Sequence, residues 1–242
     1  FNSCLSGLRS SFSKSGISGS TFDRVMAGVT PDMKVIQSLN SQPEFRTPIW
    51  DYLAFLVDAQ KISDGRAKMA QHASALNAAQ RRFGVDKYTI AAVWGVESDF
   101  GQLAGRWSLP QALGTLTCVP NRRSRYFRGE LLSTLKIVQR GDLPPQKLRG
   151  SWAGAFGQTQ FMPSTYLRLA VDGDGDGRRD LVSSTADALH STANFLRKAG
   201  WQNGGVWGYE VRVPGGYSGP SGRKGRKALS YWGKQGVRRI DG

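Results

Sequence analysis

Residues 171–181 read VDGDGDGRRDL. This alternating run of aspartates and glycines constrains what the chain can fold into more than any other stretch of the sequence. Three of its acids fall at positions 1, 3 and 5 of an EF-hand-type loop: Asp172, Asp174 and Asp176. Gly177 stands at position 6, where such a loop turns sharply, and Arg178 would offer its backbone carbonyl at position 7. Because carboxylates this close repel one another without a cation, the pattern predicts a calcium-binding loop. The alternative is a solvated acidic turn that binds metal only weakly.

The end of this loop departs from the usual EF-hand pattern. Position 12 holds Ser183 in place of the bidentate glutamate, and the nearest acid beyond it is Asp187. The predicted loop is therefore longer than usual and extends over 172–187. Since the chain has one such loop, and its flanks differ from those of paired sensor EF-hands, we expect a structural calcium site and not a switch.

Apolar periodicity predicts a mainly α-helical fold with a small β element. Helices are expected from Thr21, after an N-terminal cap at Thr47 with Pro48 at the first helical position, and over 61–83, which Gly84 would end. Further helices are expected over 87–99, from Pro163, over 186–199, and over 127–140, where Leu131, Leu132, Leu135 and Val138 lie on one side. Residues 209–213 alternate like a strand. Residues 214–227 are rich in Gly, Ser and basic side chains and are expected to form a loop.

The helix expected over 87–99 carries a carboxylate on its apolar face. Asp86 is placed to cap its start and Gly101 to end it. Ile90, Val93 and Trp94 define the apolar face, and Glu97 follows at the next position of the same period. Burial would raise the pKa of such a carboxyl, which is what a glycosidase needs to protonate a leaving sugar oxygen. The alternative is a glutamate near a helix end that reaches solvent or pairs with an arginine.

A second catalytic acid is not evident beside Glu97. Most glycosidases use two carboxylates. The nearest candidate is Asp99, but residues two apart on a helix point to different sides. The sequence therefore favours a mechanism with one carboxylate, in which the substrate supplies the missing group.

Residues 150–165, GSWAGAFGQTQFMPST, combine small residues with amides and aromatic rings. Glycines let the backbone approach a ligand closely. Ser151 and Gln160 offer neutral hydrogen-bonding groups, and Phe161 offers a flat apolar surface. This chemistry suits a sugar better than a phosphate, and no Gly-Lys-Ser/Thr follows to make a P-loop. A tight turn that packs on the core is the alternative.

The chain is strongly basic, with a formal net charge of +15 over 242 residues. Such a charge attracts polyanions, among them nucleic acid, an anionic cell wall and a membrane surface. The basic residues are dispersed in small clusters, and the sequence has no zinc-finger spacing, bZIP heptads or RRM signature. We therefore expect no nucleic-acid partner.

Two cysteines, Cys4 and Cys118, lie far apart in the sequence and form no CxxC motif. They are either two buried free thiols or one disulfide formed in an oxidising compartment. The sequence has no apolar run long enough to span a bilayer and no signal peptide, so the protein is either cytosolic or has lost its signal.

Taken in order, four segments resemble the B-type family of lytic murein transglycosylases: Glu97–Gly101, the glycine-rich stretch 150–165, the aspartate run, and Ala193–Leu196. The similarity extends from CLSGLR near the start to GVRRIDG at the end. It implies a lysozyme-like α domain, residues 76–242, with an additional helical region, residues 1–75, packed on it. It also implies one EF-hand-like structural calcium site and a Cys4–Cys118 disulfide.

The resemblance assigns roles to particular residues. Glu97 would be the catalytic acid and then the base. These residues would line the saccharide groove or adjoin Glu97: Ser98, Ser151, Gln160, Phe161, Met162, Asn194 and Phe195. The calcium ligands would be Asp172, Asp174, Asp176, Arg178 and Asp187. Relatives usually have Tyr in place of Phe195, and they continue beyond Gly242, so the chain is expected to be truncated at its C-terminus.

The implied reaction is non-hydrolytic cleavage of the MurNAc–GlcNAc β-1,4 bond of peptidoglycan, which leaves a 1,6-anhydro-MurNAc end. The alternatives are a hydrolytic muramidase on the same scaffold and a non-catalytic wall-binding protein. The resemblance also implies a monomer in the periplasm or cell envelope, with its signal peptide removed. A lipid anchor and further cell-envelope partners are left open.

Overall fold

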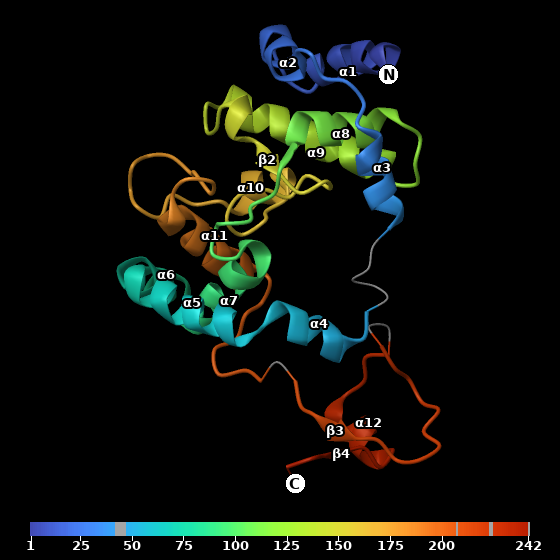
Figure 1. Ribbon diagram of the computed structural model, residues 1–242, viewed down its shortest axis with the longest axis vertical. Coiled ribbons are helices and arrows are strands. Elements are labelled where there is room, and N and C mark those ends of the chain that lie inside the picture. The colour runs from blue at the N-terminus through green and yellow to red at the C-terminus, as the bar shows by residue number, and fades with distance from the viewer. Residues whose placement is uncertain (42–46, 207, 223–224, 242) are drawn as a thin grey trace. The chain divides into compact units, whose positions relative to one another are not determined.

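The computed structural model describes residues 1–41, 47–206, 208–222 and 225–241. The chain divides into two compact units, Phe1–Trp201 and Gln202–Gly242. The first unit is built from these elements (Figure 1): helices α1 (Asn2–Ser13), α2 (Gly19–Met26), α3 (Met33–Asn40), α4 (Ile49–Leu56), α5 (Ala59–Gln71), α6 (Ala73–Phe83), α7 (Lys87–Ser98), α8 (Leu109–Cys118), α9 (Ser124–Gln139), α10 (Pro163–Leu169) and α11 (Thr185–Lys198), with strands β1 (Trp107–Ser108) and β2 (Arg149–Gly150). The mainly α-helical prediction is confirmed.

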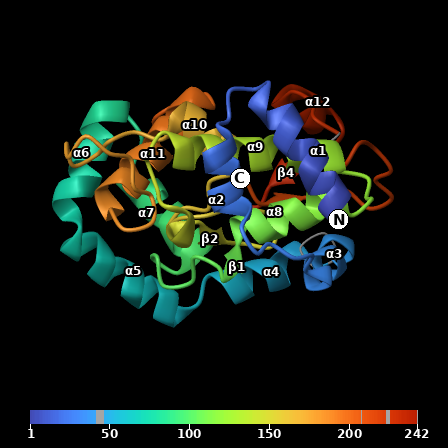
Figure 2. The ribbon, with the colours of Figure 1, turned by 90° about the horizontal axis from the view of Figure 1, so that it is seen from above.

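The core of the first unit has two parts. In one, α8 packs along α9, and α2, α3 and α10 cover them. Leu131 and Leu135 of α9 are fully buried there, which is the face that periodicity predicts. In the other part, α6 and α7 pack on α11 around Leu76, Trp94 and Leu189. Figure 2 shows both pairs side by side, α8 with α9 and α6 with α11.

A disulfide joins α1 to the end of α8. Cys4 and Cys118 are bonded, and their Cα atoms are 5.7 Å apart across a sequence separation of 114 residues. The bond ties the N-terminal helix to the larger part of the core, and the described residues include no free cysteine. This is the pairing that the family resemblance implies.

Several helix boundaries follow the predicted signals. Asp86 caps α7, since its carboxylate accepts from Thr89 N at 2.9 Å. Pro163 is the first residue of α10, and Gly84 ends α6 in the left-handed region with φ +68°. The predicted boundary between regions 1–75 and 76–242 lies within α6, and that division stays a prediction.

Two helix predictions are wrong in detail. The single helix expected over 61–83 is divided at His72, so that α5 packs on α7 while α6 packs on α11. The ring of His72 lies edge-on to Trp94 at 5.2 Å. The helix expected to be capped by Thr47 begins at Ile49, with Pro48 as its N-cap residue. None of its residues is buried.

The second unit contains a short antiparallel pair and one helix. Strand β3 (Val211–Arg212) pairs with β4 (Arg238–Arg239), and α12 spans Leu229–Lys234. The strand predicted over 209–213 is therefore confirmed in part. The loop predicted over 214–227 has no helix or strand at its described residues, while 223 and 224 lie outside them.

Candidate functional site

The C-terminal end of α7 places Glu97 at the surface and not in the core. Ile90, Trp94 and Ser98, four residues apart, form the buried stripe of the helix. Glu97 lies at the edge of that stripe and is exposed. The expectation of a buried carboxylate is therefore wrong, because Ser98 takes the core position that periodicity gave to Glu97. One step along a helix turns the side chain by about 100°.

The surroundings of Glu97 nevertheless favour its protonated form. Nearby segments of the protein remove water from around this carboxyl, and this desolvation raises its pKa. Among the described residues no cation forms an ion pair with Glu97, so of the two alternatives the arginine pair is not found, while a glutamate near a helix end that reaches solvent is what the structure shows. The side chain is thus accessible to a ligand while its proton is held more tightly than on an ordinary glutamate.

Asp99 is turned away and engaged elsewhere. Its carboxylate accepts from Lys61 Nζ of α5 at 3.0 Å. Its backbone is left-handed, with φ +51°, and so are Phe100 at +56° and Gly101 at +87°. Left-handed backbone is uncommon for residues other than glycine. These three left-handed residues reverse the direction of the chain and turn Asp99 away from Glu97, in agreement with a single-acid site.

The reversal is held in place by the ring of Phe100, which is buried against α5 and α7. A Cβ atom at Gly95 would lie 2.7 Å from Phe100 Cζ, and one at Gly65 would lie 3.2 Å from it. Both glycines are thus needed for the ring to approach the helices. A larger side chain at Gly95 would displace the segment that directly follows Glu97.

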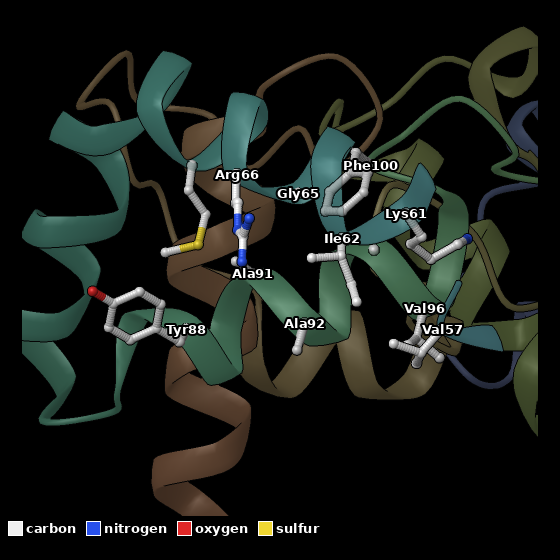
Figure 3. A pocket seen from close by; sticks show the side chains of 12 residues that line it. Val57, Lys61, Ile62, Gly65, Arg66, Tyr88, Ala91, Ala92, Val96 and Phe100 are labelled. Carbon is white, nitrogen blue, oxygen red and sulfur yellow. The ribbon is translucent and has the colours of Figure 1, made fainter. Parts of the chain in front are cut away.

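An apolar groove of about 260 Å³ runs between α5 and α7. Figure 3 shows Arg66 and Tyr88 toward one end of it and Val57 and Val96 toward the other. Sequence reasoning missed this groove, although small residues on α7 could have signalled it, since Ala92 and Gly95 lie at the helical spacing that brings α5 close. By helical geometry this face of α7 is opposite to the one that carries Glu97.

Ser98 links the end of α7 to the glycine-rich segment. It is 2% exposed, and its hydroxyl donates to the carbonyl of Gln158 while accepting from Gly101 N at 2.9 Å. The hydroxyl is buried and its hydrogen bonds are all internal, including a longer one to Trp94 O at 3.4 Å, so the assignment of Ser98 to the substrate-binding residues stays a prediction. Its role is to position the segment that carries Glu97.

Replacing Ser98 with Ala should lower the free energy of unfolding by about 1–3 kcal/mol, because Gln158 O and Gly101 N both lose a buried partner. Urea denaturation followed by circular dichroism measures this change. Ser133→Ala is the matched control, since the Ser133 hydroxyl makes only an exposed bond to Gly129 O within its own helix. Equal effects of the two substitutions would contradict the positioning role.

The glycine-rich segment folds into a tight loop by close backbone approach. Gly150 pairs with Trp107 in the β1–β2 ladder, and a Cβ atom on it would lie 2.0 Å from Ala155 O. Ser151 accepts from Ala155 N through its hydroxyl at 3.0 Å. Phe156 and Phe161 close the loop through backbone bonds in both directions. The turn alternative is thus correct for the backbone, and it leaves Ser151 only partly buried.

Gln160 connects this loop to the chain that follows α7. Its side-chain amide donates to Ala104 O and to Gly157 O, both at 2.9 Å, and its backbone is left-handed with φ +51°. Together with the Ser98–Gln158 bond, this contact fixes the loop beside the end of α7. Gln158, whose amide lies in the same segment, is 7% exposed and bonds to Val182 and Thr185.

The C-terminal half of α11 completes the same neighbourhood. The rings of Phe161 and Phe195 lie 5.8 Å apart, and Phe195 is 39% exposed. Asn194 is half-buried and donates to Leu169 O at 2.8 Å, which holds α11 against α10. Met162 is half-buried at the start of α10. The structure therefore brings the glycine-rich loop together with the end of α7 on one side and α11 on the other.

The described residues include one other buried acid that the sequence did not single out. Glu130 of α9 is 4% exposed and accepts from Ser164 N at 2.9 Å and Ser164 Oγ at 2.7 Å. These bonds satisfy the first turn of α10. Because its carboxylate is fully engaged, Glu130 is a structural acid.

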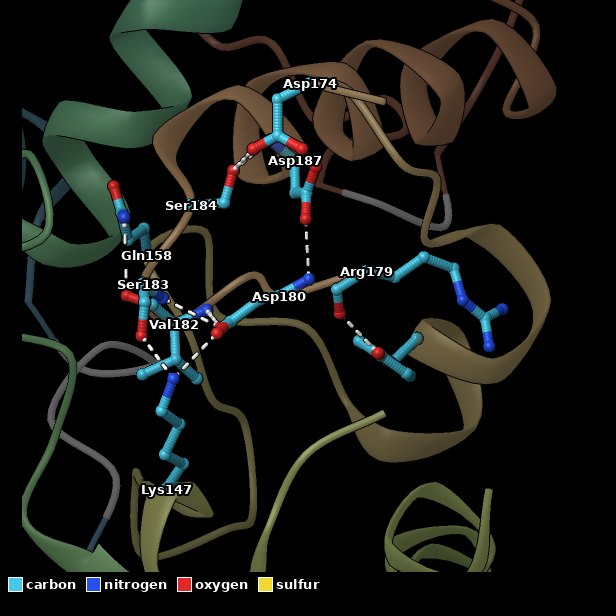
Figure 4. Close-up of polar contacts among 10 residues, drawn as sticks. Lys147, Gln158, Asp174, Arg179, Asp180, Val182, Ser183, Ser184 and Asp187 are labelled. Carbon is cyan, nitrogen blue, oxygen red and sulfur yellow. Dashed lines mark hydrogen bonds and ion pairs between the residues drawn. The ribbon is translucent and has the colours of Figure 1, made fainter. Parts of the chain in front are cut away.

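The aspartate run forms an acidic cluster with Asp187 at its base. One carboxylate oxygen each of Asp172, Asp174 and Asp187 can be chosen so that all three lie within 4.8 Å of one another. Asp187 is 1% exposed and accepts from Gly173 N and Asp180 N, as Figure 4 shows for Asp180. Asp176 is not among these three, and its carboxylate accepts from Arg178 N at 2.8 Å.

The electrostatics of this cluster fit a cation. Burial raises the pKa of Asp187, and the charges of Asp174 and Asp172 add to the effect. The pKa of Asp172 is lowered by bonds from Gly175 N and Gly177 N. Carboxylate oxygens held this close, one of them buried, are ligands of the kind that Ca²⁺ prefers.

Three comparisons place the chain among known proteins. The family described as "Transglycosylase SLT domain" matches residues 1–242. The membrane-bound lytic murein transglycosylase B of Escherichia coli is 37% identical over 153 residues, which is 63% of this chain and 42% of that protein. Its name describes that protein as membrane-bound, and within the part of this chain that the structure describes no helix is long and apolar enough to cross a membrane.

Solved structures of similar proteins match this chain over nearly its whole length. SltB3 of Pseudomonas aeruginosa, in complex with NAG-anhNAM-pentapeptide, has 42% identity and a TM-score of 0.88, covering 100% of this chain and 64% of that one. The lytic transglycosylase Slt35 of E. coli, in complex with calcium, has 29% identity and a TM-score of 0.86, covering 98% of this chain and 75% of that one. The chain thus spans less than two thirds of the first two relatives, and the expected lysozyme-like fold class is confirmed.

Proposed function

The chain belongs to the family of transglycosylase SLT domains, and we propose that it cleaves the MurNAc–GlcNAc β-1,4 bond of peptidoglycan without water. The observation that carries this proposal is Glu97, an exposed carboxyl whose pKa is raised by desolvation alone. Asp99, the nearest other acid in sequence, is bound to Lys61. Such a site supplies one group for proton transfer and no carboxylate nucleophile.

In the proposed reaction Glu97 first donates its proton to the oxygen that links the two sugars. The bond from that oxygen to C1 of MurNAc then breaks, and the 2-acetamido group of the same sugar stabilises the positive charge that develops. Glu97, now ionised, takes the proton of the MurNAc 6-hydroxyl while its oxygen attacks C1. One proton leaves Glu97 and one returns, so the enzyme is restored and the product is a 1,6-anhydro ring.

The sugar would lie along the neighbourhood described above. Ser151, Gln160 and Asn194 would offer polar groups, and Phe161, Met162 and Phe195 would offer apolar surface. Phe195 is supported by its exposed ring, which stands against Phe161. Because it lacks a hydroxyl, Phe195 would support the sugar by contact alone. Ser98, whose hydroxyl is buried, would belong to the site as the neighbour that holds Glu97 in place.

Digestion of purified sacculi tests the proposal. The expected result is release of soluble fragments whose MurNAc ends are anhydro, and therefore lighter by one water than hydrolysed ends. Hydrated reducing ends would favour a muramidase on the same scaffold. Binding to sacculi without release of any fragment would favour a non-catalytic wall-binding protein.

A structural calcium ion is proposed for the loop 172–187. Asp172, Asp174 and Asp187 would ligate it, and the cation would relieve the repulsion that their clustering creates. Asp176 and the Arg178 carbonyl are retained as further candidate ligands. The support comes from the geometry of the cluster and from the calcium complex of Slt35. The ion would stabilise the start of α11, which carries Asn194 and Phe195 further along.

Calcium should raise the melting temperature of protein that has been treated with a chelator. At a hundredfold excess over its dissociation constant the ion adds about 2.7 kcal/mol, which corresponds to roughly 5–10 °C for a chain of this size. Differential scanning calorimetry with and without CaCl₂ measures the shift. Asp187→Asn should lose it, whereas Asp51→Asn, an exposed acid on α4, should keep it. A shift that Asp187→Asn retains would argue against this site.

Location and assembly follow from the same proposal. We place the protein in the periplasm or cell envelope, as a monomer that acts on glycan strands. The Cys4–Cys118 disulfide supports this placement, because such bonds persist in oxidising compartments. The division into a helical region over 1–75 and a catalytic core over 76–242 remains part of the proposal.

A further inference from the structure

The second unit carries a higher density of positive charge than the rest of the chain. Residues 202–242 contain eight Lys and Arg against two acids, a net charge of +6 in 41 residues. The other 201 residues contribute the remaining +9 of the total +15. A unit this small and this basic attracts anions strongly for its size.

Two of its arginines stand directly opposite each other. Arg212 of β3 and Arg238 of β4 are register partners in the antiparallel pair, so their side chains leave the same face. Cβ atoms in such positions are about 5 Å apart, and like charges placed there destabilise the pair. Both side chains are exposed. The unit thus holds a like-charge pair that two short strands do not need for folding.

The neighbouring cations show that this pair differs from its surroundings. Arg239 forms an ion pair with Asp241 and lies 4.5 Å above the ring of Tyr209, so its charge is partnered within the unit. Arg238 instead donates through Nη1 to Gly233 O at 2.6 Å, at the end of α12, and to Val237 O at 3.0 Å. These bonds fix the guanidinium, and Arg238 forms no ion pair with any described residue. Arg212 forms no ion pair with any described residue.

We infer that Arg212 and Arg238 bind a carboxylate, and that this carboxylate belongs to the peptide stems of peptidoglycan. An anion between the two guanidinium groups would turn their repulsion into two attractions, and guanidinium matches a carboxylate in a bidentate manner. The inference rests on the proposed function, because the glycan it names is the one whose stems carry free carboxylates. It makes the protein selective for peptide-bearing over naked strands.

Co-sedimentation with sacculi tests the inference apart from catalysis. The parent and an Arg212→Gln/Arg238→Gln variant are mixed with intact sacculi and with sacculi whose stems an amidase has removed, at low and moderate salt. Lys14→Gln/Arg24→Gln is the matched control, because it removes two exposed cations from the first unit. The expected result is about tenfold weaker binding of the Arg212→Gln/Arg238→Gln variant to intact sacculi only, the range expected for two lost exposed ion pairs. The control and the stripped sacculi should show no such loss.

Other outcomes overturn the inference. Equal loss in the Arg212→Gln/Arg238→Gln variant and the control would mean that only net charge matters. Equal loss on intact and stripped sacculi would assign the pair to another anion, such as the lactyl carboxylate that the amidase frees on each MurNAc. Cleavage of naked glycan, measured for both the parent and the Arg212→Gln/Arg238→Gln variant, separates the proposed cleavage activity from the proposed carboxylate binding. If turnover is absent the proposed function fails, while the binding comparison still decides the role of Arg212 and Arg238.

Discussion

Replacing Glu97 with Gln is expected to slow glycan cleavage by about 10³-fold, the scale of a lost general acid and base. The amide keeps the size of the side chain but cannot exchange a proton. Glu97 is exposed and forms no ion pair with the described residues, so the variant should fold normally. The release of soluble muropeptides from sacculi, followed by chromatography over time, measures the rate.

The effect of Glu97→Gln on the free energy of unfolding depends on pH in a defined direction. A carboxyl whose pKa is raised in the folded protein is less readily ionised there than in the unfolded chain. The contribution of this carboxyl to stability is therefore full below the pKa that it has in the unfolded chain. It is lost as the pH rises through the pKa that it has in the folded protein. Glu97→Gln should consequently lose no stability at neutral pH, and a calorimetric scan at two pH values checks this. Inactivity accompanied by unfolding would not support the catalytic role.

Asp99→Asn is the matched control for the single-acid mechanism. The substitution breaks the ion pair with Lys61, which is partly exposed and contributes little to stability. We expect this variant to cleave glycan within severalfold of the parent rate. A loss as large as that of Glu97→Gln would mean that a second carboxylate takes part in the reaction, and the single-acid account would be wrong.

Removing the disulfide should have the largest effect on stability. Cys4 and Cys118 close a loop with a sequence separation of 114 residues. For a loop of that length the chain-entropy argument gives about 4–5 kcal/mol, or roughly 10 °C or more in melting temperature. A Cys4→Ser/Cys118→Ser variant, compared with the parent by thermal unfolding, measures the difference.

Reductant supplies the control for this second prediction. Dithiothreitol should lower the melting temperature of the parent toward that of the double variant and leave the variant unchanged. If the parent were insensitive to reductant and equal in stability to the variant, the bond would contribute nothing to the fold. Because Cys4 lies on α1, the loss should be seen first as release of the N-terminal helices from the core around α8 and α9.

The parts of the fold that periodicity and caps encode locally were predictable. Asp86, Pro163 and Gly84 mark helix boundaries where the structure has them. Helix α8 was not predicted, because its sequence LPQALGTLTC contains glycine and two threonines of low helix propensity. It forms because Leu109, Leu113 and Leu116 are fully buried against its neighbours. Tertiary packing of this kind leaves a weak local signal.

The sequence predicts which residues could form the candidate site, but not how they are arranged. Periodicity gave the core position to Glu97 when Ser98 holds it, because the buried sector of α7 is centred on Trp94 and Gly95. The sequence could not show this, since the position of that sector depends on which helices cover α7. In the acidic loop, Asp187 joins the cluster because Gly173 and Asp180 hold its carboxylate, and both contacts span many residues.

The central claim is decided by which oxygen becomes bonded to C1 of MurNAc, that of the 6-hydroxyl or that of water. Sacculi are digested in water enriched in ¹⁸O, and the released fragments are weighed. The account predicts anhydro ends without ¹⁸O, because the 6-hydroxyl of the same sugar closes the ring. Reducing MurNAc ends that carry ¹⁸O would show that water is the nucleophile, and the protein would then be a hydrolase that uses Glu97 in another way.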